Sequence, residues 1–127
     1  MQLRFIKFLL PFVIFAGSIR SFNSYGWVIY LPLLFAWLFI PLAEVFIKPN
    51  PSNMSAAEEE LAKKNKGYDI LLYLVVVAQY FALYEFLSSM KNDTLTWYET
   101  AGRIVVMGML CGVFGINVGH ELGHRVN

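Results

Sequence analysis

The chain has only two histidines, His120 and His124, and they stand four positions apart at the end of an apolar segment. On a helix, residues four apart share a face with their Cβ atoms about 5–6 Å apart, so two imidazoles at this spacing can converge on one metal ion. Ionisable groups in membrane segments are costly and are mostly functional. The spacing therefore predicts a metal site with His120 and His124 as its ligands. The alternative, that both histidines have only a structural role, is less favoured.

The residues around the pair suggest supporting roles. Asn117 precedes His120 by three positions, so it lies on nearly the same face and could orient a ligand through a hydrogen bond. Glu121 points about 100° away around the helix and can pair with Arg125 one turn on. We expect neither Asn117 nor Glu121 to be a metal ligand.

A stripe of small residues runs along the same segment. Its glycines recur at intervals of three or four: Gly108, Gly112, Gly115, Gly119 and Gly123. In lipid, such a stripe lets another helix approach closely. It indicates either that the histidines are held against partner helices or simply that this segment packs like any other membrane helix.

The histidine spacing alone leaves the metal open. His-Glu-x-x-His is the zinc-peptidase signature, with Glu121 as general base, and such a site needs a third protein ligand further along. Imidazole suits non-haem iron equally well, and an oxygen-activating centre needs several more ligands. A third hypothesis is a packing module without catalysis, in which neither histidine binds metal.

Composition places the histidines in a membrane protein. Hydrophobic residues make up 57% of the 127 residues and charged residues 15%, whereas a soluble domain is about a quarter charged. The apolar residues gather in long charge-free runs, which favours the membrane class. The net charge of +1 predicts no nucleic-acid surface, and the single cysteine excludes an intramolecular disulfide.

Four apolar segments predict an all-α membrane bundle of about four transmembrane helices, the first of them short. They cover residues 5–19, 21–43, 70–90 and about 100–124. Pro32 and Pro41 predict a kink in the second segment or an early end to it. The first has an alternative reading as a cleavable signal peptide, because basic residues precede it and Ala16-Gly17-Ser18 follows.

Lysine placement predicts the orientation. The loop at about 44–69 carries four lysines and the next loop only Lys91, and positive residues prefer the cytoplasmic side. The N-terminus, this loop and the histidines would then face the cytoplasm. Ser55 and Glu58 match a capping box for a short surface helix that would stop at Gly67, but we favour the alternative of a simple solvated connector. Arg103 is expected to extend toward the outer headgroups.

The run Asn117-Val-Gly-His-Glu-Leu-Gly-His-Arg125 resembles the first histidine box of membrane-bound alkane hydroxylases in the fatty acid desaturase superfamily. That box typically reads Asn-x-x-His-Glu-Leu-Gly-His followed by Lys or Arg. The upstream order is similar too: Pro-Leu-Ala-Glu ends a span, an acidic and then lysine-rich loop follows, and Tyr68-Asp69 opens the next span. The likeness covers most of the chain and favours iron over zinc.

The resemblance implies a membrane helix bundle with a histidine-rich, non-haem di-iron centre on the cytoplasmic side. The membrane it implies is the bacterial inner membrane. Such enzymes hydroxylate an alkane or related fatty chain with dioxygen and electrons from a rubredoxin-like donor. His120 and His124 would be iron ligands. Because the family needs further histidine boxes, residues 1–127 are expected to be the N-terminal membrane part of such a domain, incomplete relative to the family fold and inactive alone.

Overall fold

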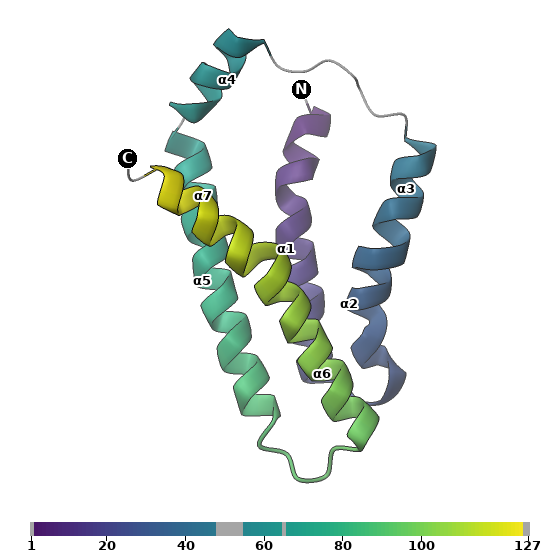
Figure 1. Ribbon diagram of the computed structural model, residues 1–127. Coiled ribbons are helices and arrows are strands. Elements are labelled where there is room, and N and C mark those ends of the chain that lie inside the picture. Colours follow the sequence, from purple (N-terminus) through teal and green to yellow (C-terminus); the bar gives the residue numbers. More distant parts are fainter. Residues whose placement is uncertain (1, 48–54, 65, 126–127) are drawn as a thin grey trace.

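The computed structural model describes residues 2–47, 55–64 and 66–125, and these residues form helices with no strand among them (Figure 1). The predicted all-α class is therefore confirmed. Three helices are long and apolar enough to cross a membrane: Gly26–Phe46, Lys66–Ser89 and Trp97–His124. A further apolar stretch covers Leu9–Phe22, within a first helix that extends from Gln2 to Phe22.

The long helices are built from segments of different helix type. In chain order the elements are α1 (Gln2–Phe22), the 3₁₀ helix η1 (Gly26–Tyr30), α2 (Leu31–Leu34), the π-helix η2 (Phe35–Phe39), α3 (Ile40–Phe46), α4 (Ala56–Lys63), α5 (Lys66–Ser89), α6 (Trp97–Leu110), the π-helix η3 (Cys111–Ile116) and α7 (Asn117–Arg125).

The two prolines of the second long helix mark its changes of type. Pro32 stands in the first turn of α2 and Pro41 in the first turn of α3, with the π-helix η2 between them. Proline lacks a backbone N–H, and the wider π turn re-pairs the backbone around the missing donor. The helix changes type near both prolines but continues from Gly26 to Phe46, so the predicted early end does not occur and the kink stays a prediction.

The break between the first two segments lies later than the sequence suggests. Helix α1 continues to Phe22, and a turn follows in which Ser24 N donates to the Ser21 carbonyl oxygen over 3.0 Å. Gly26, the first residue of η1, then takes a φ of +69°, a conformation that favours glycine. The turn therefore needs residues 23–25, which the hydropathy pattern alone assigns to the second span.

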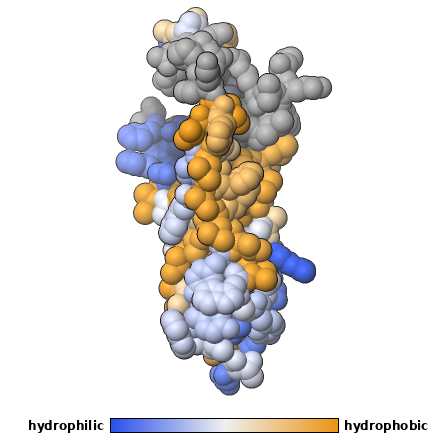
Figure 2. Space-filling model, turned by 90° about the vertical axis from the view of Figure 1, so that its right-hand side faces the viewer, coloured by the Kyte–Doolittle hydropathy of each residue, from blue (hydrophilic) through white to orange (hydrophobic). Residues whose placement is uncertain are grey.

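Helix α1 lies in the middle of the bundle and packs against α5, α2 and α6 (Figure 1). The buried core includes Phe22, Val106 and Leu110, none of which has exposed surface. Large apolar side chains are instead exposed on the outer face of the second long helix, where Trp37 and Phe46 are 60% and 84% exposed. Figure 2 shows this hydrophobic surface above a polar lower end, as expected for helices that face lipid.

Arg103 does not extend outward, so the prediction that it reaches the headgroups is wrong. It is 2% exposed, and its guanidinium lies 5.6 Å from the centre of the Tyr25 ring. Nη1 donates to the Ser89 carbonyl oxygen over 2.9 Å and Nη2 to the Ser24 carbonyl oxygen over 2.8 Å. Carbonyl groups at helix ends lack partners within the helix, and they draw this cation inward.

The connector contains a short helix, α4, so the surface-helix interpretation holds and not the simple solvated connector that we favoured from the sequence. The Glu58 side chain of the predicted capping box lies outside the described residues. Gly67 does not stop this helix: α4 ends at Lys63, and Gly67 lies in the first turn of α5. N–H groups in a first turn have no partner within the helix, so glycine is tolerated there and need not mark an end.

Candidate metal centre

The start of α1, the connector helix α4 and the end of α7 lie at one end of the bundle, and the α5–α6 loop lies with η1 at the other (Figure 1). This arrangement brings together the three segments that the lysine pattern assigns to one side of a membrane. The histidines are at this end.

A single continuous helix, α6–η3–α7, carries the histidines. It begins with a capping box in which Glu99 Oε2 accepts a hydrogen bond from the Thr96 N–H over 2.9 Å. Along the helix, the Phe114 ring lies 4.9 Å from the ring of Phe15 in α1. The capping box fixes the start of this helix, and the aromatic contact holds its π segment against the centre of the bundle.

The imidazoles of His120 and His124 lie on one face of α7, with ring centroids 5.0 Å apart and ring planes inclined by 31°. Both side chains are exposed. With a metal–nitrogen bond of about 2.1 Å, two imidazoles bound to one ion at roughly 100° have ring centres about 5 Å apart. The separation of the rings is compatible with one shared ion, and metal binding by the pair stays a prediction.

The neighbours of the pair do not take all the roles suggested by the sequence. Asn117 Nδ2 donates to the Val113 carbonyl oxygen over 2.7 Å, so this amide group bonds to its own helix and not to an imidazole. Glu121 is exposed. Its predicted ion pair with Arg125 lies outside the described residues, which exclude that arginine side chain.

The glycine stripe is mostly open. A methyl group added at Gly108, Gly112, Gly119 or Gly123 would meet nothing within 4 Å, whereas one at Gly115 would lie 3.8 Å from Gln79 Nε2 of α5. The closest approach is instead at Gly102, outside the stripe, where Ile29 and Tyr30 lie 2.9 Å from the added atom. Within the described residues, the stripe is not where helices meet most closely.

Carboxylates do not complete the site. The described residues contain no group of three or more histidine, cysteine, aspartate or glutamate side chains that could hold a metal. Glu44 is exposed on α3, and Glu85 accepts a hydrogen bond from Asn23 Nδ2 over 3.1 Å at the opposite end of the bundle. If the pair binds an ion as predicted, His120 and His124 would supply two donors, and no carboxylate of the described residues would join them.

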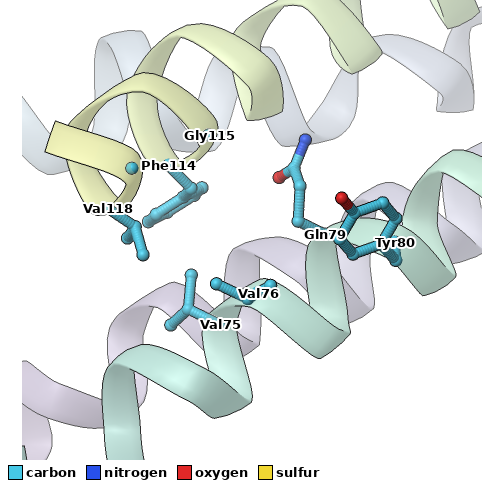
Figure 3. Close-up of a pocket in the computed structure, with 8 residues that line it drawn as sticks. Val75, Val76, Gln79, Tyr80, Phe114, Gly115 and Val118 are labelled. Atoms are coloured by element: carbon cyan, nitrogen blue, oxygen red, sulfur yellow. The ribbon is translucent and has the colours of Figure 1, made fainter. Parts of the chain in front are cut away.

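A groove of about 270 Å³ lies beside the histidine helix, between α5 and the η3–α7 segment (Figure 3). It is lined by Val75, Val76, Gln79, Tyr80, Phe114, Gly115, Val118 and Gly119. Its last lining residue, Gly119, directly precedes His120. The hydropathy pattern does not reveal this groove; the available signal was Gln79, the one carboxamide in the apolar run 70–84.

No family model matches the chain, and neither a curated protein nor a solved structure matches it.

Proposed function

We propose that this chain is the N-terminal membrane part of a non-haem di-iron hydroxylase that acts on an alkane or fatty chain. The observation that carries the proposal is the pair of exposed imidazoles, 5.0 Å apart on one face of α7, the helix whose other face lines an apolar groove. The histidine box supports iron over zinc by its resemblance to the alkane hydroxylases.

His120 and His124 would hold one edge of the iron centre. When bound, the two irons would supply the activation of dioxygen that oxidises a C–H bond. Two neutral imidazoles leave most positions of two irons without protein ligands. The chain alone is therefore inactive in this proposal, and its contribution is to position two ligands.

The groove supports an apolar substrate. Apart from Gln79 and the Tyr80 hydroxyl, its lining is made of aliphatic and aromatic side chains and two glycines. A hydrocarbon dissolves in the bilayer and can enter a groove between membrane helices without crossing water. The apolar walls would also keep water away from a reactive centre.

Charge supports an orientation with the histidines in the cytoplasm. Nine Lys and Arg residues fall in the described ranges, and six of them belong to segments at the histidine end: Arg4, Lys7, Lys63, Lys64, Lys66 and Arg125. The other three are Arg20, Lys91 and Arg103 at the opposite end, where Arg103 is buried. This asymmetry fits four spans with the histidine end in the cytoplasm, and the simplest location is the bacterial inner membrane. The iron would then be accessible to a rubredoxin-like donor in the cytoplasm.

The groove fits the alternative zinc peptidase less well. A peptidase must bind the backbone N–H and C=O groups of its substrate, commonly by pairing them with a strand edge. The described part of the chain has no strand, and its groove offers few polar groups. The peptidase hypothesis therefore rests on the His-Glu-x-x-His string alone.

The experiment that tests the proposal is to read the transcript beyond codon 127 and to measure the metal content of its complete product. We expect further histidine boxes and two irons per polypeptide. A single zinc, together with one acidic or histidine ligand downstream, would support the peptidase instead. An absence of bound metal would support the packing module.

A further inference from the structure

Gln79 has one polar atom without a partner. Its Nε2 donates to the Cys111 sulfur over 3.4 Å, whereas its Oε1 is buried and has no hydrogen-bond partner among the described residues. A buried polar group without a partner is costly, and most such groups are paired in folded proteins. The unpaired atom therefore points to a missing hydrogen-bond partner.

This carboxamide stands in the wall of the groove. Figure 3 shows it rising from α5 toward the histidine helix, between the valines and Phe114 on one side and Tyr80 on the other. The volume of about 270 Å³ lies below the usual range of about 300–1,000 Å³ for drug-sized ligands. The space suits one aliphatic chain better than a ring system or a two-chain lipid.

We propose that the groove binds a single aliphatic chain that carries a hydroxyl group, and that this hydroxyl group hydrogen-bonds to the Gln79 carboxamide. The inference deepens the proposed function by naming the substrate class. A hydroxyl group can donate to Oε1, and it can equally accept from the amino group if the carboxamide is turned over. An alkane can do neither, and a carboxylate can only accept, so only the hydroxyl group can pair with Oε1 as the side chain stands.

The position of Gln79 makes this hydroxyl group a recognition element and not the reacting group. Gly115 lies against Gln79 and precedes His120 by five residues, which is about 7 Å along a helix at 1.5 Å per residue. A chain anchored at Gln79 would lie along the side of this helix that faces α5, and it would extend from there toward the level of the histidines.

Photoaffinity labelling of the full chain in lipid nanodiscs tests this inference. The probes are a 1-alkanol and the alkane of equal length, each carrying the same diazirine, and labelled peptides are mapped by mass spectrometry. We expect the alcohol to label segments 75–80 and 111–119 at least about tenfold more than the alkane does, which is the scale of one hydrogen bond. Unlabelled 1-decanol should compete, and a diacylglycerol should not.

Variants of the groove separate the hydrogen bond from general partitioning into lipid. Gln79→Leu and Gln79→Met keep the bulk and remove the polar atoms, so they should abolish the preference for the alcohol and retain labelling by the alkane. Cys111→Ala removes the partner of Nε2 only and should keep the preference. Val76→Trp fills the space and should reduce labelling by both probes.

Equal labelling by the two probes in the unaltered chain would overturn the proposal, and so would a preference that survives in both Gln79 variants. Competition by the diacylglycerol would assign the groove to a membrane lipid and overturn it as well. The measurement needs no metal. A retained alcohol preference in a protein that binds no iron would therefore refute the proposed hydroxylase and leave this inference standing.

Discussion

Arg103 Nη2 donates a hydrogen bond to the carbonyl oxygen of Ser24 over 2.8 Å, across 79 positions of sequence. The same guanidinium donates from Nη1 to Ser89, the last residue of α5. The Arg103 side chain on α6 therefore caps the C-terminal ends of two other helices, α1 and α5. Its planar fork of donors suits this task, since a lysine has a single charged nitrogen.

Arg103→Ala should therefore destabilise the bundle. The substitution leaves two helix-end carbonyls unpaired, and hydrogen bonds to charged groups contribute about 1.5–3 kcal/mol each, so we expect a loss of about 3 kcal/mol. Arg103→Lys should retain part of the stability. Thermal unfolding in detergent micelles measures both, with Lys91→Ala, an exposed cation at the same end, as the control. An unaltered midpoint for Arg103→Ala would show that these hydrogen bonds contribute little.

Two glycines of α6 should respond differently to the same substitution. An alanine methyl at Gly102 would lie 2.9 Å from Ile29 Cγ2 and from the Tyr30 ring. Neither neighbour moves easily: Ile29 is fully buried, and the Tyr30 hydroxyl donates to the Tyr98 carbonyl oxygen over 2.6 Å. Gly102→Ala should therefore cost about 1–3 kcal/mol, the usual range for overpacking.

Gly108→Ala is the matched control, because an added methyl meets nothing within 4 Å. Alanine is a better helix former than glycine by about 1 kcal/mol, so this variant should be neutral or slightly more stable. Comparing the thermal midpoints of the two variants under identical conditions measures the difference. Equal losses at Gly102 and Gly108 would contradict the close approach of η1 to α6.

The sequence predicts the helical class and the approximate positions of the long helices because hydropathy and proline are local signals. It also predicts the shared face of His120 and His124, since that follows from helix geometry. These features need no knowledge of how the chain packs.

Features that depend on packing between helices could not be predicted from the sequence. The inward position of Arg103 depends on helix ends far away in the chain, and the π-helix η3 forms where Phe114 meets Phe15. The unpaired Gln79 oxygen is visible only once α5 and η3 lie side by side. The glycine pattern misleads for the same reason, because spacing alone cannot show that Gly102 is the crowded position.

Asn117 should have little influence on metal binding. Its amide nitrogen bonds to the Val113 carbonyl oxygen, so replacing it by alanine removes a contact within the helix and not one to an imidazole. Losing a partner that orients a ligand typically lowers metal affinity about 10–100-fold. We expect Asn117→Ala to leave the affinity for Co²⁺, followed by visible absorption, unaltered. A loss within that range would show that Asn117 turns to a histidine when metal binds.

The histidine pair itself should bind metal as a unit. Replacing either His120 or His124 by alanine leaves one imidazole, which can no longer chelate, so each single variant should lose at least about tenfold in Co²⁺ affinity. The double variant should lose less than the sum of the two, because the first substitution already removes the chelate. Glu121→Gln is the control: it lies next to His120 but is assigned no ligand role, and its affinity should match that of the unaltered chain. Full affinity in either single histidine variant would show that the metal is bound elsewhere. A loss in Glu121→Gln equal to that of the histidine variants would show that a different set of donors binds it.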